Sequence, residues 1–251
     1  MVKRGIFVPP FDELVDPAIL ADLAEAAERH GWDGFFLWDH VAYREPVRAV
    51  ADPWVALAAI ACRTERLRIG PMVTPLARRR VHKLARETVT LDHLSRGRLT
   101  LGVGLGSDRN DEFERFGEVT EPRERARLLD EGLERLSRYW AGELEPPPVQ
   151  QPRIPVWAAS RWPNRRPLRR AAHWDGLFPI ELPRPEALAE LVEEIGELRA
   201  GNADPFDFVV EIGPGDDAEA WEAAGATWVL TSFDYTPRLE EVRAATEAAP
   251  R

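Results

Sequence analysis

Residues 67–103 read LRIGPMVTPLARRRVHKLARETVTLDHLSRGRLTLGV and contain one complete strand–helix–strand unit. The apolar run Leu67–Val73 predicts a strand, and Arg98–Val103 predicts the strand that follows it. Val81–Leu94 between them predicts a helix, which the turn sequence Ser95-Arg96-Gly97 closes. A helix that connects two such strands indicates that the strands are parallel and that the helix covers one face of their sheet.

The same alternation of strands and helices extends over the whole chain. Six further strands are predicted at Arg4–Pro9, Asp33–Trp38, Ile154–Ala159, Gly176–Pro179, Phe208–Ile212 and Thr227–Thr231. Seven further helices are predicted at Asp16–Arg29, Asp52–Thr64, Arg123–Trp140, Pro167–His173, Pro185–Arg199, Asp217–Ala224 and Pro237–Ala248. The pairs Asp16-Pro17 and Asp52-Pro53 mark helix starts, because Pro is favoured at the first helical position.

Eight strand–helix units in 251 residues predict an α/β fold of the (β/α)₈ type, the TIM barrel. No linker is long enough to separate two domains, so we expect one domain over residues 1–251. The Pro-rich stretch 146–155 is interpreted as a stiff connector inside the barrel. A doubly wound open sheet is the alternative, because the number of strands inferred from a sequence is uncertain by one or two.

Composition and charge exclude several classes of function. The chain has 33 basic and 43 acidic residues and a net charge of −10, so it lacks the overall basic character of a nucleic-acid-binding protein. No apolar run reaches the roughly 18 residues of a membrane span, and Met1–Gly5 lacks the apolar core of a signal peptide. Because Cys62 is the single cysteine, an internal disulfide is excluded. Cys62 lies in an Ala/Leu-rich predicted helix, and we expect its side chain to be buried in the core. We therefore expect a cytoplasmic protein without nucleic-acid or membrane partners.

The loops that follow the strands carry the chemistry of a barrel. The loop after the second predicted strand begins with Asp39 and His40, and an imidazole there can act as a general acid or base near neutral pH. The alternative is a purely structural histidine. No His pair or carboxylate cluster indicates a metal site. Neither Lys3 nor Lys83 ends a strand, which disfavours the Schiff-base chemistry of an aldolase barrel, and no acid–base arrangement of a sugar-phosphate isomerase is found.

Two arginine-rich segments and one glycine-rich segment lie on this same face. Arg78–Arg80 and Arg161–Arg166 are suited to a phosphate or carboxylate ligand, although a solvated run of charges is the alternative. Gly102–Gly106 lacks the third glycine of a dinucleotide-binding fingerprint. At the end of a barrel strand, these glycines allow a flat ring to lie against bare backbone. A tight turn explains them equally well.

Several segments resemble the luciferase-like monooxygenase family. The resemblance rests on GPMVTPLARRR at 70–80, LARETVTLDHLSRGR at 84–98, GVGLG at 102–106, IPVWAA at 154–159 and the Asp39-His40 pair. It covers residues 1–180 well and the remainder through the alternation of strands and helices. It implies a compact variant of the family barrel with shortened insertions. It also implies a flavin-type cofactor across the barrel mouth, either FMN or, as the alternative, the deazaflavin coenzyme F420.

The resemblance also assigns residues to this cofactor. The third strand is expected to end in a bulge, often with a cis peptide bond in relatives, that supports the ring at Met72, Val73 and Thr74. The ring or its side chain would pass over Gly104, Leu105 and Gly106. The phosphate would be held by the loop after the fifth strand, at Ser160, Arg161, Trp162, Asn164 and Arg165. His40, with Asp39 beside it, would stand near the reactive edge of the ring as a proton donor or hydrogen-bond partner.

The implied function is an oxidoreductase or monooxygenase that transfers hydride between the ring and a small-molecule substrate, with or without oxygen activation. NAD(P)H or a flavin reductase would be its partner. The resemblance also implies a homodimer packed through outer helices, and nine tryptophans exceed what one barrel core needs. Arg44 and Ser107 stand where deazaflavin-dependent sugar-phosphate dehydrogenases have Trp and Glu, which disfavours that substrate. Since the segments 141–153 and 213–216 are short, a non-catalytic flavin- or ligand-binding barrel without a lid is the alternative function.

Overall fold

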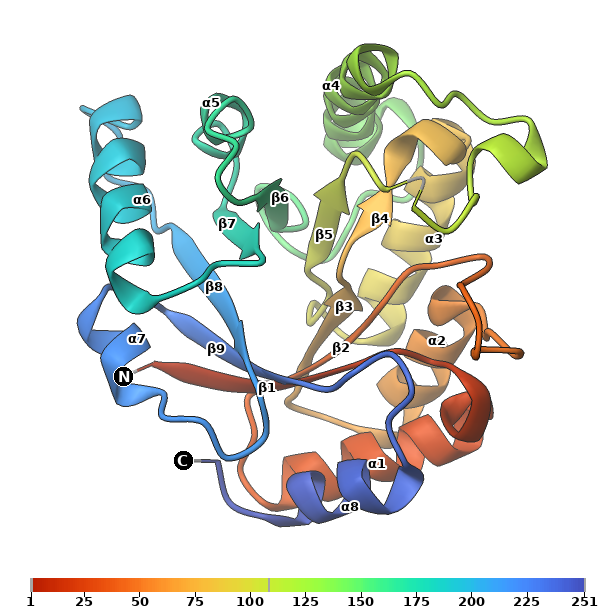
Figure 1. Ribbon diagram of the computed structural model, residues 1–251. Helices are drawn as coiled ribbons and strands as arrows, with labels where there is room; N and C mark the ends of the chain where they lie inside the picture. The colour runs from red at the N-terminus through yellow and green to blue at the C-terminus, as the bar shows by residue number, and fades with distance from the viewer. Residues whose placement is uncertain (1, 108, 251) are drawn as a thin grey trace.

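Parallel β-strands form the centre of the molecule and helices surround them (Figure 1). The computed structural model describes residues 2–107 and 109–250. The strands are β1 Lys3–Val8, β2 Gly34–Leu37, β3 Arg68–Pro71, β4 Thr74–Pro75, β5 Leu101–Gly104, β6 Val156–Arg161, β7 Gly176–Ile180, β8 Asp207–Ile212 and β9 Trp228–Ser232. The helices are α1 Pro17–Arg29, α2 Pro53–Arg63, α3 Val81–Leu94, α4 Pro122–Arg138, α5 Leu168–Ala171, α6 Pro185–Leu198, α7 Glu219–Ala223 and α8 Leu239–Glu247.

The strands follow the order β3-β2-β1-β9-β8-β7-β6-β5-β4, and all paired strands are parallel. β3 and β4 are two halves of one barrel strand, interrupted at the cis peptide bond between Met72 and Val73. Ile69 of β3 pairs with Leu99, just before β5, and β4 pairs with β5 itself. The two ends of the strand order therefore meet. This closure confirms the predicted (β/α)₈ barrel and excludes the open doubly wound sheet.

Local signals in the sequence set the starts and ends of several helices. Asp16 caps α1 by accepting a hydrogen bond from the backbone N–H of Ala18 at 2.8 Å, and Asp52 caps α2 through the N–H of Trp54 at 2.9 Å. Each of these helices then begins with Pro, as predicted. Gly97 adopts a φ of 81° just after α3, a conformation that glycine reaches without steric cost.

The inside of the barrel is filled by large side chains. The interior cluster consists of Phe7, Phe36, Met72, Trp157, Phe178, Val209, Trp228 and Leu230. The rings of Trp157 and Trp228 lie 5.4 Å apart, near the N-terminal ends of their strands. A Cβ atom on Gly176 would lie 2.5 Å from the Trp157 ring, so the glycine makes room for it. The barrel is thus a packed core, and a ligand can enter only at the C-terminal ends of the strands.

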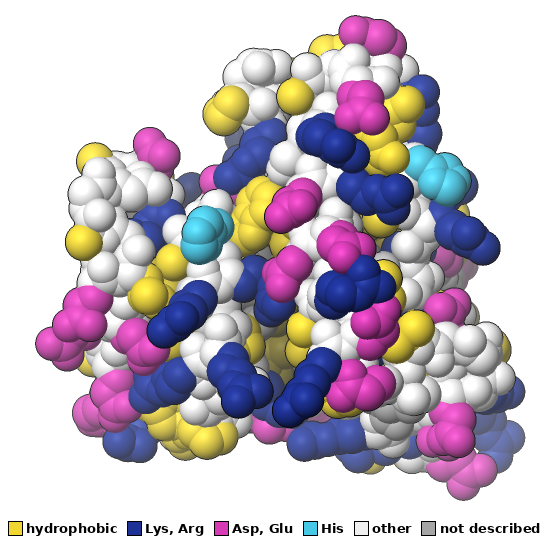
Figure 2. Space-filling model, turned by 90° about the horizontal axis from the view of Figure 1, so that it is seen from above, with side chains coloured by type: hydrophobic (Ala, Val, Ile, Leu, Met, Phe, Trp, Pro, Cys, Tyr) yellow, Lys and Arg dark blue, Asp and Glu magenta, His cyan; other side chains and the backbone are white. Residues whose placement is uncertain are grey.

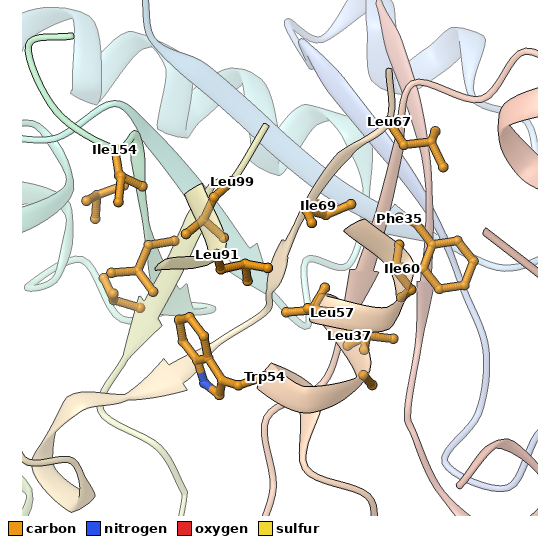
Figure 3. Close-up of a cluster of buried hydrophobic side chains, with 14 of the residues drawn as sticks. Phe35, Leu37, Trp54, Leu57, Ile60, Leu67, Ile69, Leu91, Leu99 and Ile154 are labelled. Carbon is orange, nitrogen blue, oxygen red and sulfur yellow. The ribbon is translucent and has the colours of Figure 1, made fainter. Parts of the chain in front are cut away.

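A second apolar layer lies between the barrel and its helices. Figure 3 shows Trp54, Leu57 and Ile60 of α2 beside side chains of β2 and β3, and all of these residues are buried. Burial of a side chain of this size contributes about 1.5–3 kcal/mol, so this layer holds the helices in place around the sheet.

Some expectations for individual residues are wrong. Cys62 is exposed, because it lies on the side of α2 that faces away from the barrel. Five of the nine tryptophans are buried and four are half-buried, and the homodimer stays a prediction. The long helix α4 ends in a π-helical turn at Tyr139–Glu143 instead of continuing as an α-helix to Trp140. Among the helices of the described residues, none is both long and apolar enough to cross a membrane.

Candidate active site

The C-terminal ends of β2, β4 and β5 bring a histidine and two carboxylates together. Nδ1 of His40, just after β2, lies 2.6 Å from Oε2 of Glu112, which belongs to the loop after β5. Glu112 also accepts hydrogen bonds from the backbone N–H of Val41 at 2.8 Å and from the Arg78 guanidinium at 3.1 Å. Because Nδ1 serves Glu112, Nε2 is the nitrogen of His40 that a ligand can reach.

Glu112 is the residue of this site that the sequence did not reveal. Its side chain is 1 % exposed, and burial alone would raise its pKa. The hydrogen bond and charge of His40, the charge of Arg78 and the N–H of Val41 outweigh this, so the pKa of Glu112 lies below its ordinary value. Glu112 therefore stays ionised and orients the imidazole. Its neighbours in residues 109–116 are mostly charged or polar, and no periodic pattern marks it as buried.

The carboxylate of Asp39 is buried and is not accessible to a ligand in the barrel mouth. Its carboxylate is 2 % exposed and accepts hydrogen bonds from the Thr74 hydroxyl at 2.7 Å and the Trp54 indole at 3.3 Å. Arg78 and Arg79 bind it at 2.9 and 2.8 Å. Burial favours the neutral acid, but the charges of Arg79 and Arg78 hold the pKa of Asp39 below its ordinary value. The predicted direct role of Asp39 does not fit this saturated carboxylate, which instead positions the loop.

The same contacts correct the expectation for Arg78 and Arg79 but do not involve Arg80, which is exposed. The side chain of Arg78 is only 4 % exposed and bridges Asp39 and Glu112. Arg79 is 17 % exposed and is paired with Asp39. Two buried carboxylates need countercharges, because an unpaired charge away from water is costly. Arg78 and Arg79 supply those countercharges and are not a phosphate cradle.

The interrupted strand lies directly against the glycines of β5. The cis peptide bond between Met72 and Val73 stands at the predicted bulge. A Cβ atom on Gly102 would lie 2.4 Å from the carbonyl oxygen of Pro71, and one on Gly104 would lie 2.8 Å from Cγ2 of Val73. Only glycine permits this close approach. Thr74 is fully buried and faces Asp39, so it supports the bulge from behind and does not line the mouth.

Leu105 and Gly106 continue from β5 along the rim of the mouth, and both are half-buried. Gly106 has a φ of 71°, and a Cβ atom there would lie 2.6 Å from the ring of Phe113. The segment is therefore a compact turn whose backbone is bare of side chains at two of three positions.

Aromatic side chains build the wall beside His40. The ring centroids of Tyr43 and His40 are 4.9 Å apart, and those of Tyr43 and Tyr235 are 5.5 Å apart. Phe11 and Trp38 complete the cluster, each with its ring within about 6 Å of the His40 ring. Nε1 of Trp38 is buried and has no hydrogen-bond partner among the described residues. A buried donor of this kind costs free energy unless a water or a ligand accepts its hydrogen bond.

The loop after β6 has its polar groups engaged with one another and with α6. The Ser160 hydroxyl donates to the backbone oxygen of Asn164 at 2.9 Å. Arg161 is paired with Glu181, and Arg165 binds Glu190 at 2.7 Å while its guanidinium lies 4.6 Å from the centre of the Trp162 ring. The side chains of Arg161 and Arg165 are 38 and 35 % exposed, so each is more than one-third exposed. A phosphate could exchange with these surface carboxylates, but it finds no preformed empty cradle here.

A separate hollow of about 410 Å³ lies outside the barrel between α4 and α5. Figure 2 shows this face of the molecule with basic and acidic side chains interspersed around the depression. Asp130 and Glu134 line it from α4, and Arg166, Arg169 and Arg170 line it from the opposite side. Arg170 is already paired with Asp130. The hollow contains none of the strand-end residues described above.

Comparisons with known proteins agree with the barrel fold. The model of the luciferase-like monooxygenase family matches residues 4–251. An uncharacterized protein of Mycobacterium tuberculosis is 30 % identical over 266 aligned positions, which cover 90 % of each chain. An F420-dependent glucose-6-phosphate dehydrogenase of Nakamurella multipartita is 36 % identical over 138 positions, which span 52 % of this chain but only 39 % of that enzyme.

A solved structure shows the same fold at low sequence identity. An F420-dependent secondary alcohol dehydrogenase in complex with an F420–acetone adduct superimposes with a TM-score of 0.81. The match covers 99 % of this chain and 98 % of that one at 16 % identity. This similarity therefore concerns the fold of the barrel.

Proposed function

Because the chain belongs to the luciferase-like monooxygenase family, we propose that it is an oxidoreductase that uses a flavin-type cofactor to transform a small molecule. FMN is the cofactor we expect first, and F420 is the alternative. The observation that carries the proposal is the His40–Glu112 pair, which leaves Nε2 of His40 available beside the glycine-lined end of β5.

The residues at the mouth fit the ring of such a cofactor. We propose that the ring lies against Met72, Val73 and the turn Gly104–Gly106, where the backbone is accessible. The unpaired Nε1 of Trp38 supports this placement, because it needs an acceptor. The phosphate would bind at Ser160, Arg161, Trp162, Asn164 and Arg165, as the resemblance implies. To bind there, the phosphate must displace Glu181 from its ion pair with Arg161.

The proposed chemistry divides between the cofactor and the protein. The bound ring supplies or accepts a hydride. His40 would hold or transfer a proton at Nε2, and Glu112 would stabilise the positive charge that the imidazole then carries. Asp39 would act through Arg78, Arg79 and Thr74 as a positioning residue. The aromatic wall of Phe11, Trp38 and Tyr43 would keep water away from the reacting atoms.

The proposal is tested by titrating the purified protein with FMN and with F420 while following absorbance and fluorescence. Binding of one of them, followed by turnover with NAD(P)H or with a flavin reductase, is the expected result. Binding without any turnover favours the alternative of a non-catalytic flavin-binding barrel. Failure of both compounds to bind contradicts the proposed function.

Two further expectations stay predictions at this point. A homodimer would give about twice the chain mass of 28.4 kDa in light scattering at micromolar concentration, and a monomer would contradict it. A cytoplasmic location would be checked by fractionating the cells that make the protein.

A further inference from the structure

The wall of the mouth opposite the interrupted strand carries a carboxyl group that the proposed function leaves unused. Glu211 lies near the end of β8, two residues after Val209, whose side chain belongs to the barrel interior. Side chains two residues apart on a strand share a face, so Glu211 also faces the interior, at the level of the mouth. In the strand order, β8 is four places from β3 in one direction and four places from β4 in the other.

The surroundings of Glu211 differ from those of an ordinary surface carboxylate. Its carboxyl group forms hydrogen bonds with the Ser232 side chain of β9 and with the backbone of Glu181, just after β7. From β6, Arg161 attracts it, but Arg161 is paired with Glu181, and Arg109 is paired with Glu181 as well. Burial raises the pKa of Glu211 above its ordinary value, and the two hydrogen bonds counter this only in part.

We propose that Glu211 is a ligand-facing residue whose carboxyl group donates a hydrogen bond to an uncharged acceptor oxygen in the barrel mouth. The inference rests on the proposed function, because the ligands in question are those of the proposed reaction. The acceptor is either a carbonyl oxygen of the cofactor ring or the carbonyl or hydroxyl oxygen of a substrate.

The chemistry of the mouth favours an uncharged acceptor. A neutral carboxyl group has one O–H donor, and Nε1 of Trp38 is a second donor without a partner among the described residues. Phe7 belongs to the apolar cluster of the barrel interior, and Ile180 packs against that cluster.

The first test follows the titration of Glu211 directly. Carbon-13 NMR of glutamate-labelled protein gives one side-chain signal per Glu, and the Glu211→Gln variant identifies the signal of Glu211 by its loss. We expect a midpoint above that of ordinary glutamates in the free protein. Ligand binding should raise it further, because a ligand that accepts the hydrogen bond stabilises the protonated form. The probes are FMN, F420, and cyclohexanone added to cofactor-saturated protein.

The two sources of the acceptor give different results in this experiment. A rise on addition of FMN or F420 alone assigns the acceptor to the ring. A rise only after cyclohexanone is added assigns it to the substrate. An ordinary midpoint, or one that no probe moves, would overturn the inference.

The second test measures affinity for whichever probe moves the signal. At pH 6, Glu211→Ala should weaken binding about tenfold, the usual worth of one well-made hydrogen bond. Wild-type affinity should fall as the pH rises, whereas Glu211→Gln should bind within about threefold of wild type and without that pH dependence, because its amide keeps a donor. Glu186→Gln on the exposed surface of α6 is the charge-matched control and should change nothing.

The outcomes separate this inference from the function on which it rests. If neither FMN nor F420 binds the wild-type protein, the proposed function fails and the inference fails with it. If a cofactor binds normally but Glu211→Ala binds every probe like wild type at all pH values, only the inference is wrong.

Discussion

The two sides of the barrel mouth treat a buried carboxyl group in opposite ways. Next to β2, Glu112 and Asp39 each contact arginine side chains, and the pKa of each lies below its ordinary value. On β8, Glu211 is half-buried, the Arg161 guanidinium that attracts it is paired with Glu181, and burial raises the pKa of Glu211. The placement of arginines, not the carboxyl group itself, thus decides in which direction the pKa of each carboxyl group moves.

This difference assigns distinct tasks to the two sides. The ionised side can orient and charge-stabilise an imidazole, as Glu112 does for His40. A carboxyl group with a raised pKa, such as Glu211, can also donate a hydrogen bond when it is neutral. A site that moves a hydride and a proton gains from having both, because pKa values that are pushed apart separate the acid and base roles.

The largest expected effect comes from removing the imidazole on the ionised side. His40→Ala should lower turnover by about 10²–10⁴ if Nε2 transfers a proton in the slow step, while cofactor affinity stays within about tenfold of wild type. Steady-state rates and cofactor titration of the same preparation measure the two quantities. His40→Asn is the control for a purely structural role, and a nearly wild-type rate in that variant, with a flat profile between about pH 5 and 8, would retire the catalytic assignment.

The next effect is on stability and concerns Asp39. Asp39→Ala leaves Arg79 without its carboxylate and removes one of the two partners of Arg78, whose side chain is 4 % exposed. Breaking a buried pair of this kind costs roughly 3–5 kcal/mol of unfolding free energy. Denaturant unfolding measures it.

A matched variant shows whether burial is the cause. Asp22→Ala removes a partner of Arg63 in a pair whose side chains are 51 and 58 % exposed. Exposed pairs contribute about 0–1 kcal/mol, so this variant should be close to wild type. Equal losses in both variants would contradict the role assigned to Asp39.

The phosphate loop should show a smaller effect, on cofactor binding. Arg161→Ala and Arg165→Ala should each weaken FMN affinity by about 10–100-fold, since a hydrogen bond to a charged group contributes about 1.5–3 kcal/mol. The salt dependence of binding should weaken too. Glu181→Gln frees Arg161 from its ion pair and should leave FMN affinity unchanged or improve it. If neither arginine variant differs from wild type, the phosphate binds elsewhere.

The smallest effect is the most direct check of the contrast between Glu112 and Glu211. Because the folded-state pKa of Glu112 is lowered, its contribution to stability is present above the ordinary value of 4.5 and is lost as the pH falls through the folded-state pKa. For Glu211 the pKa is raised, so stability is lost as the pH rises through the folded-state pKa.

The two Gln variants should therefore differ from wild type in opposite directions at neutral pH. Glu112→Gln should be less stable than wild type near pH 7, and the gap should close below pH 4.5. Glu211→Gln should match wild type in acid and become relatively more stable towards neutral pH. We expect differences of about 1 kcal/mol, measured by thermal unfolding at a series of pH values. Parallel curves for the two variants would remove the distinction between the two sides.

Much of the fold and part of the site could be predicted from local sequence. Asp16-Pro17 and Asp52-Pro53 start their helices as expected, since a helix cap and a Pro act within three residues of the chain. The resemblance to a family predicts the bulge at Met72–Val73, where the structure has a cis peptide bond, whereas the close approach of Pro71 to Gly102 was not predicted. That family is confirmed, and with it the general class of oxidoreductase.

The sequence alone did not show which charged side chains are buried or which residues they pair with. Glu112 lies 72 positions from His40 and 34 from Arg78, and Asp39 lies 40 from Arg79. The sequence of an arginine run does not show whether its side chains are solvated, bind phosphate or neutralise a carboxylate. The alternation of strands and helices determined the barrel, because that pattern depends on near neighbours. The pairing of charges at its mouth arose only when strand closure brought distant loops within 3 Å of one another, where Coulomb and desolvation energies act.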